Sequence, residues 1–180
     1  LFPEALGGRP ADDFYRAVNK TQPSYIRVEA DELTYNFHII LRFELEQAML
    51  SGDLAVADLP AAWNDKMQTM LGVTPPNDSQ GCLQDVHWTR PGFGYFPTYA
   101  LGNLYAAQFM ETAVAQNPAI ADELAQGKTT ALLAWLRENI HQHGKKFTPG
   151  ELVQRVTGQP LSHAAFIRYA TAKFGELYAL

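Results

Sequence analysis

The stretch "EADELTYNFHIILRFELEQAML", residues 29–50, carries the clearest helical pattern in the chain and decides the fold class. Acidic residues open it, where a helix dipole favours negative charge, and the pair Ser51-Gly52 closes it. Apolar side chains recur at steps of three and four residues, as they do on one face of a helix. The expected face consists of Leu33, Phe37, Ile40, Leu41 and Ala48. The pattern predicts one long helix over residues 29–50.

The other segments with this spacing are shorter, and turn residues separate them. Asp58 is expected to cap the helix that ends at Gly72, and Thr148 is expected to form a capping box with Glu151. Further helices are predicted at residues 10–20, 59–71, 96–116, 118–126, 128–143, 149–156 and 162–180. We therefore expect an all-α fold, an irregular bundle of long and short helices. At least half of the residues should be helical, and no sheet should exceed a short hairpin.

The composition indicates a globular chain with a single helical domain over residues 1–180. With 47% hydrophobic residues the chain can bury a core. The formal net charge is −5 and the 14 Lys and Arg residues are scattered, so we expect no nucleic-acid partner. No apolar run approaches the roughly 18–20 residues of a membrane span, so we expect no membrane contact. The single cysteine, Cys82, excludes an internal disulfide and a thiolate zinc site, and it suits a cytoplasmic location.

The segment "GCLQDVHWTRPGFGYFPTY", residues 81–99, combines hydrogen-bonding and aromatic side chains with Gly and Pro. Such a segment is irregular until its last residues, and its aromatic content argues against disorder. We interpret it as a rigid loop that presents a functional site and leads into the helix predicted at residues 96–116.

Most of the histidines do not form a recognisable metal site. Zinc sites without cysteine usually need histidines at helical spacing, as in His-Glu-x-x-His, and the chain contains no such motif. His141 and His143 are close in sequence, but helix neighbours two residues apart point away from each other. His38 is interpreted as a partly buried, hydrogen-bonded helix residue, and His163 as an exposed one. We expect this chain by itself to bind no metal.

His87 differs from the other histidines because it lies in the loop, between Asp85 and Trp88. Asp85 can fix the tautomer of the imidazole, and Trp88 can shield it from water. These neighbours favour a functional histidine. A loop histidine that only braces the next helix stays open as the alternative.

Two motifs in the chain carry a family resemblance. "IRVEAD" at residues 26–31 and "GCLQDVHW" at residues 81–88 resemble the Ile-Arg-x-x-Ala-Asp and Gly-x-x-Gln-Asp-x-His-Trp signatures of the carboxypeptidase Taq family of zinc metallopeptidases. "ELTYNFHIILRFELE" and "FGYFPTYALGNLYAAQ" are similar to that family too, so the resemblance extends over most of the chain. It implies an all-helical, deeply grooved peptidase that removes C-terminal residues from peptides, with this chain as one wall of the groove.

In the family, zinc is held by a His-Glu-x-x-His helix and a later glutamate, and these motifs precede the one that "IRVEAD" matches. They are absent here. The resemblance therefore implies the C-terminal portion of a longer metallocarboxypeptidase, inactive alone, with zinc (or another divalent metal such as cobalt) in the complete enzyme. The implied partners are peptide C-termini, the missing N-terminal portion and a second copy in a homodimer. The alternative is a non-catalytic peptide-binding or dimerisation module derived from that family.

The resemblance also suggests residue roles. Arg27, in the first motif, is the candidate clamp for a substrate carboxylate because a guanidinium presents a planar fork. The alternative is an ion pair with Glu29, Asp31 or Asp85.

A looser similarity to angiotensin-converting enzyme, another helical zinc peptidase, suggests roles for the loop. His87 would bind the substrate backbone, Tyr95 the terminal carboxylate, and Tyr99 the oxyanion. The alternative for either tyrosine is a core aromatic at the start of a helix. Gln84 and Asp85 are expected to shape the loop and orient His87, and Trp88 completes the expected substrate-binding set. We expect Tyr95, Tyr99 and His87 to converge on one surface, with Arg27 nearby.

Overall fold

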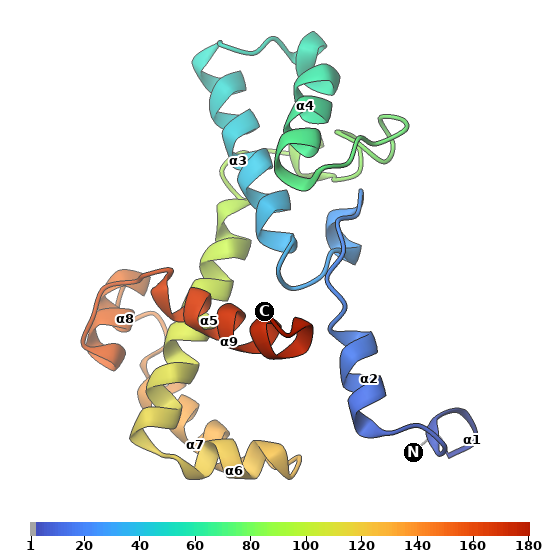
Figure 1. Ribbon diagram of the computed structural model, residues 1–180. Helices are drawn as coiled ribbons and strands as arrows, with labels where there is room; N and C mark the ends of the chain where they lie inside the picture. Colours follow the sequence, from blue (N-terminus) through green and yellow to red (C-terminus); the bar gives the residue numbers. More distant parts are fainter. Residues whose placement is uncertain (1–2) are drawn as a thin grey trace. The chain divides into compact units, whose positions relative to one another are not determined.

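The computed structural model describes residues 3–180, which fold into helices joined by turns and loops (Figure 1). More than half of the chain lies in α-helices, and no strand occurs within residues 3–180, so the prediction of an all-α fold is confirmed. The α-helices are α1 (Pro3–Leu6), α2 (Ala11–Val18), α3 (Tyr35–Ser51), α4 (Leu59–Leu71), α5 (Pro97–Gln116), α6 (Ala119–Ala125), α7 (Thr130–Asn139), α8 (Pro149–Thr157) and α9 (Ala164–Tyr178). Short 3-10 helices span Arg27–Glu29, Val56–Asp58, His87–Thr89 and His141–His143.

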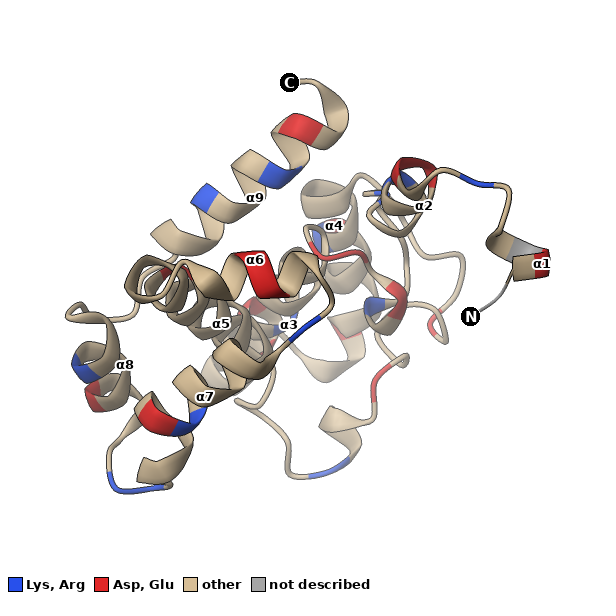
Figure 2. Cartoon of the chain, turned by 90° about the horizontal axis from the view of Figure 1, so that it is seen from below, with Lys and Arg blue, Asp and Glu red and all other residues tan. Residues whose placement is uncertain are grey.

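The chain divides into two compact units, residues 1–100 and residues 101–180. Every α-helix that carries Lys or Arg also carries Asp or Glu, and Figure 2 shows the two signs interspersed along the helices. The scattered charge expected from the sequence is therefore seen in the structure. No helix within the described residues combines the length and the apolar character that crossing a membrane requires.

The core of the first unit lies between α3 and α4. Leu41 and Leu45 of α3 pack against Trp63 and Met67 of α4, and all four side chains are buried. Cys82 joins this cluster from the segment that follows α4. Burial of these apolar side chains fixes the α3–α4 pair and holds the start of the loop at residues 81–99 against it.

The long helix starts later than the sequence predicts, at Tyr35 rather than at residue 29. Ala30 is extended, with φ −66° and ψ 144°. One oxygen of the Asp31 carboxylate accepts hydrogen bonds from the backbone N–H of Leu33 and of Thr34, at 2.9 Å each. Asp31 thus satisfies the first free donors of the helical turn from outside it, as a capping residue does, and the chain before it need not be helical.

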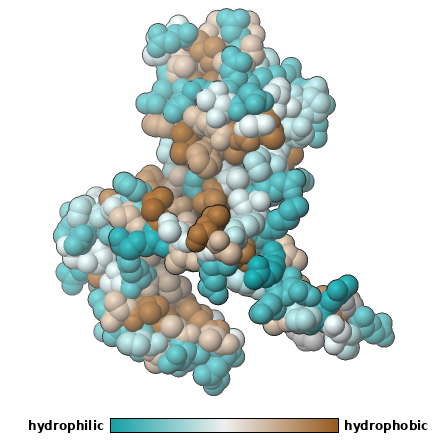
Figure 3. Space-filling view, viewed as in Figure 1, coloured by the Kyte–Doolittle hydropathy of each residue, from teal (hydrophilic) through white to brown (hydrophobic). Residues whose placement is uncertain are grey.

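The predicted apolar face of this helix is wrong in part: Leu41 is buried in the core, as expected, but two other members are not. Phe37 and Ile40 remain 42% and 41% exposed, and brown patches over α3 and α4 in Figure 3 show that the first unit keeps apolar surface. The buried face of α3 instead includes His38, Arg42 and Glu46 at steps of four residues. Periodicity of apolar residues misses such a face, because polar side chains are buried where partners elsewhere satisfy them.

The second unit has its own small core. Ala113 of α5, Ile120 of α6, Trp135 of α7 and Val156 of α8 form one buried cluster. The indole N–H of Trp135 donates to the side-chain oxygen of Gln116 at 2.7 Å, which satisfies the polar atom of this large core residue. The core therefore connects four consecutive helices.

Helix ends in the two units test the predicted caps. The capping box is confirmed: the Thr148 hydroxyl accepts from the Glu151 N–H, and the Glu151 carboxylate accepts from the Thr148 N–H. Asp58 makes no side-chain capping bond because it lies in the 3-10 turn before α4, so that prediction is wrong. The helix predicted over residues 128–143 ends at Asn139, since Ile140 leaves helical geometry and a 3-10 turn follows.

Candidate functional site

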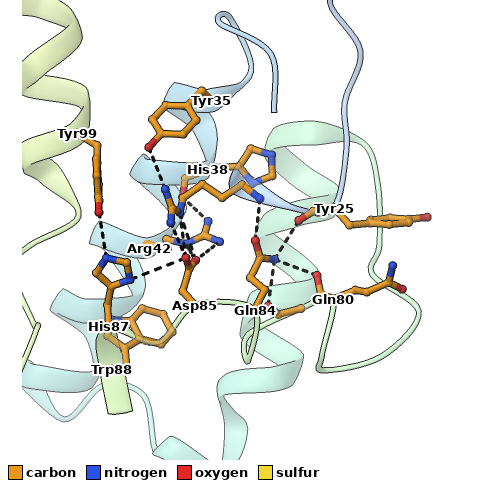
Figure 4. A network of polar contacts seen from close by, with 12 residues as sticks. Tyr25, Tyr35, His38, Arg42, Gln80, Gln84, Asp85, His87, Trp88 and Tyr99 are labelled. Atoms are coloured by element: carbon orange, nitrogen blue, oxygen red, sulfur yellow. Dashed lines mark hydrogen bonds and ion pairs between the residues drawn. The ribbon is translucent and has the colours of Figure 1, made fainter. Parts of the chain in front are cut away.

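Gln84 joins the two sequence motifs through a bond to Arg27, which lies 57 residues before it in the chain (Figure 4). Its side-chain oxygen accepts from the backbone N–H of Arg27 at 2.8 Å. Its amide nitrogen lies within hydrogen-bond distance of the carbonyl oxygens of Tyr25, Gln80 and Gly81, at 3.0, 2.9 and 3.1 Å. These bonds satisfy backbone groups of an irregular segment, so Gln84 fixes the start of the loop against residues 25–27.

Asp85 lies between two buried arginines. One of its oxygens accepts from Nη2 and Nε of Arg27 at 2.7 and 3.1 Å, and the other pairs with Nη2 and Nε of Arg42 at 2.7 Å each. The Arg42 side chain is fully buried. Burial alone would raise the pKa of the Asp85 carboxyl, but the hydrogen bonds and charges of Arg27 and Arg42 outweigh it and lower that pKa. The carboxylate therefore stays charged and holds both guanidinium groups.

The guanidinium nitrogen of Arg27 that does not bind Asp85 contacts a tyrosine. Its Nη1 donates to the hydroxyl of Tyr35 at 2.9 Å, and its guanidinium lies over the ring of Tyr99, 5.1 Å from the centroid. The sequence left open whether Arg27 pairs with an acid, and the structure pairs it with Asp85. Tyr35 is a neighbour of this site that sequence reasoning missed. Its place within the family-like stretch "ELTYNFHIILRFELE" was the available signal.

His87, Tyr95 and Tyr99 form one cluster of side chains. The Nε2 atom of His87 lies 3.1 Å from the hydroxyl of Tyr99, within hydrogen-bond distance (Figure 4). The ring of Tyr95 stacks on His87 with centroids 5.7 Å apart and meets Tyr99 edge-on at 5.4 Å. Tyr95 is 51% exposed, so this cluster reaches the surface. Arg27 lies against it through the ring of Tyr99.

The contacts around His87 differ in part from the expected ones. Its Nδ1 lies 3.8 Å from Asp85, too far for a hydrogen bond, so the structure does not show the bond by which Asp85 was expected to fix the tautomer. The ring packed closest against His87 belongs to Phe96, with centroids 4.4 Å apart. Trp88 instead packs edge-on against Trp63 of α4, with its indole N–H on Glu46.

His38 is fully buried on α3, and its two ring nitrogens have no hydrogen-bond partner within residues 3–180. The expectation of a partly buried, hydrogen-bonded histidine is therefore wrong. The ring enters the interior because it shares the face of α3 that carries Arg42. Burial and the nearby charges of Arg42 and Arg27 lower the pKa of His38 from 6.5 to about 4.

This lowered pKa makes the stability of the protein depend on pH. In the unfolded chain His38 takes up a proton below about pH 6.5, whereas in the folded chain it does so only near pH 4. The contribution of neutral His38 to the free energy of unfolding is therefore fully present above pH 6.5 and is lost as the pH falls from 6.5 to 4. The shift corresponds to a loss of about 3 kcal/mol. Urea unfolding at pH 7 and pH 4.5 measures it. The His38→Asn variant should lose most of this pH difference, whereas exposed His163→Asn should keep it; an equal pH difference in all three proteins contradicts the assignment.

The described residues contain no group of three or more His, Cys, Asp or Glu side chains that could hold a metal ion. The residues brought together at the site are instead arginine, tyrosine and histidine side chains around one carboxylate. The guanidinium groups are engaged with Asp85 and Tyr35, so the hydroxyl and imidazole groups of this set are the ones that could bind an anionic or carbonyl-bearing ligand.

Comparison with known proteins places the chain among metallopeptidases. Residues 1–174 match the family described as carboxypeptidase Taq (M32) metallopeptidase. The chain is 48% identical over 174 residues to thermostable carboxypeptidase 1 of Thermus thermophilus, covering 97% of this chain and 34% of that protein. It is 47% identical over 169 residues to carboxypeptidase 1 of Bacillus subtilis, covering 94% of this chain and 34% of that protein.

Solved structures agree with this match. The crystal structure of an M32 carboxypeptidase from Deinococcus radiodurans R1 matches with a TM-score of 0.96 and 48% identity, covering 99% of this chain and 36% of that one. Metallocarboxypeptidase 1 of Trypanosoma cruzi matches with a TM-score of 0.89 and 36% identity, covering 96% and 37%. The chain thus spans about a third of the length of the relatives it matches.

Proposed function

Because the chain belongs to the carboxypeptidase Taq (M32) family of metallopeptidases, we propose that it is the substrate-binding C-terminal portion of a zinc-dependent carboxypeptidase. That enzyme releases C-terminal residues from peptides. The observation that carries the proposal is the contact of Arg27 with Asp85, which joins the two family motifs beside His87, Tyr95 and Tyr99. A peptidase needs such donors to bind a free carboxylate and to stabilise an oxyanion.

The tyrosines supply neutral donors in this proposal. Burial raises the pKa of the Tyr99 hydroxyl, so it keeps its proton near neutral pH and donates to the oxyanion. Nε2 of His87 lies against the Tyr99 hydroxyl in the structure, and the proposed role of His87 is to turn this atom to the substrate backbone when a peptide binds. The exposed Tyr95 donates to the terminal carboxylate. The proposed roles of these three residues require a hydroxyl or imidazole group in a fixed position, which the contacts within the cluster provide.

Arg27 acts at the carboxylate through Tyr35. The Nε and Nη2 atoms of Arg27 bond to Asp85, and Nη1 bonds to the Tyr35 hydroxyl. The Tyr35 hydroxyl accepts a hydrogen bond from the Arg27 cation, which polarises the O–H bond of Tyr35. The hydrogen of this hydroxyl can then be donated to the substrate carboxylate. Gln84 and Asp85 hold this arrangement in place, and Trp88 anchors the loop to α3.

The complete enzyme requires parts that the described residues do not offer. Zinc, or another divalent metal such as cobalt, would polarise the scissile carbonyl and activate water there. The remaining portion of the enzyme would supply the ligands of the metal, so the chain alone is inactive.

We further propose that the enzyme is a homodimer in the cytoplasm. The single, unpaired Cys82 supports the cytoplasmic location.

A second candidate is a peptide-binding or dimerisation module without catalysis. Within α2 no residue is buried, and Phe14, Tyr15 and Val18 are exposed apolar residues on this short helix. An amphipathic helix with an uncovered apolar face favours association with another protein surface. This observation is compatible with both candidates, so an experiment must separate them.

The chain joined to the unmatched part of the Deinococcus radiodurans relative is expected to release the last residue of a peptide in the presence of zinc. The same peptide with an amidated C-terminus should react much more slowly, because the carboxylate donors lose their partner. Amino-acid release, followed by mass spectrometry, is the measurement, and the chain alone serves as control. A folded, zinc-loaded fusion that binds the peptide without cleaving it favours the non-catalytic module. Hydrolysis by the chain alone contradicts the proposal that the remaining portion of the enzyme supplies the metal ligands.

A further inference from the structure

Glu46 holds two separate points of the site loop with one carboxyl group. It lies on the buried face of α3 and is 2% exposed. Its Oε1 accepts from the indole N–H of Trp88 at 2.8 Å, and its Oε2 accepts from the backbone N–H of Gly94 at 3.1 Å. Both distances are ordinary for hydrogen bonds, so the two carboxyl oxygens fix two loop positions that are six residues apart.

These two positions are the chain neighbours of the residues in the surface cluster. Trp88 follows His87 directly, and Gly94 precedes Tyr95 directly. The rings of His87 and Tyr95 stack with centroids 5.7 Å apart, although the loop between them contains Pro91. We infer that Glu46 is a positioning residue, which sets the distance between His87 and Tyr95 by binding the loop on both sides of the turn.

The backbone of the loop shows why hydrogen bonds from another element, helix α3, matter for its shape. Gly94 has φ +80°, a conformation that favours glycine and places its N–H toward α3. Within the loop, the backbone bonds span short distances only, from Gly92 N–H to Arg90 and from Tyr95 N–H to Gly92. Such local turns do not themselves join the two ends of the loop. Ring packing of Phe96 on His87 and Trp88 brings the ends together, and a shared carboxyl acceptor on a rigid helix adds a directional bond to each of them.

The same helix face organises the rest of the loop. Arg42, one turn before Glu46, holds Asp85, so α3 contacts the loop at Asp85, Trp88 and Gly94 in order. The role of Glu46 follows from these contacts and does not depend on a peptidase reaction. Its meaning for substrate binding rests on the proposed function.

Hydrogen–deuterium exchange of the intact chain tests the inference. In the Glu46→Gln variant, which keeps size but puts an amide donor among the donors of the loop, exchange at residues 87–95 should rise by about tenfold to a hundredfold. The indole N–H resonance of Trp88 should also shift. Glu44→Gln is the matched control, because Glu44 lies on the same helix and pairs with Lys66 at the surface, and it should leave the loop unchanged.

A Trp88→Phe variant distinguishes positioning from general stability and covers the case in which Glu46→Gln fails to fold. It removes one of the two bonds, so exchange should rise at residues 87–89 while Gly94 stays protected by Oε2. The inference is overturned if either variant raises exchange equally in α4 and the loop, or leaves residues 87–95 as protected as in the unchanged chain. A failed peptidase assay leaves these results standing, so the two proposals fail separately.

Discussion

Replacing Tyr99 by Phe in the complete enzyme is expected to lower kcat by about 10²–10³-fold, with a smaller change in KM. The hydroxyl of Tyr99 lies 3.1 Å from Nε2 of His87 in the surface cluster, and its loss removes the donor proposed to stabilise the oxyanion of the transition state. The ring and its contacts with Tyr95 and Arg27 are kept by the substitution. Steady-state kinetics of the fusion with the Deinococcus radiodurans segment is the measurement.

Two further tyrosine variants make this test specific. Tyr95→Phe should chiefly raise KM for substrates with a free C-terminus, because its proposed partner is the terminal carboxylate. Tyr105→Phe, farther along the same helix α5, should change neither constant. If Tyr95→Phe and Tyr99→Phe both leave turnover unchanged, the loop is only a brace for α5, which is the alternative that the sequence left open.

Replacing Asp85 by Ala is expected to destabilise the chain by about 3–5 kcal/mol. The change leaves the buried guanidinium groups of Arg27 and Arg42 without the carboxylate that both of them bind. Urea unfolding at pH 7 measures the loss. Glu111→Ala is the control, because Glu111 also pairs with an arginine, Arg168, but does so at the surface, where the pair contributes far less.

The pH dependence of this effect has a definite sign. The pKa of Asp85 is lowered in the folded chain, so its contribution is present above the usual carboxyl pKa and is lost as acid protonates the folded form. The difference between the unchanged chain and Asp85→Ala should therefore shrink at strongly acidic pH. A loss at pH 7 no larger than that of Glu111→Ala would show that the buried cluster is not held by this carboxylate.

Local sequence rules predicted the fold class and much of the helix arrangement. The capping box of Thr148 and Glu151 is visible in four consecutive residues, and the structure contains it. The predicted start of α3 was wrong because a carboxylate, Asp31, satisfies the first turn from outside the helix. Caps of this kind depend on side-chain geometry, which apolar periodicity does not describe.

The candidate site could be predicted only where a family motif marked it. The motifs drew attention to Arg27, Gln84, Asp85 and His87, but the pairing of Arg27 with Asp85 joins residues 58 apart in the chain. No local rule chooses among its possible acidic partners.

The scaffold of the site was missed for a different reason. The burial of Arg42 and Glu46 was not predicted, because the buried face of their helix was expected to be apolar. Polar residues at steps of four on an otherwise apolar helix, His38, Arg42 and Glu46, were the signal that could have revealed a buried scaffold.

The shared carboxylate of Asp85 also limits how this protein can change over generations. Arg27, Arg42 and Asp85 lie on three different segments, and one carboxylate pairs with both arginines. Replacing either arginine leaves Asp85 paired with the other, whereas replacing Asp85 leaves two buried guanidinium groups without their carboxylate. A route to an apolar version of this cluster can lose one arginine first, but the remaining arginine and Asp85 then have to change together or pass through an unpaired buried charge. A homologue that lacks Asp85 is therefore expected to lack both arginines as well, whereas one that lacks a single arginine can keep the remaining pair.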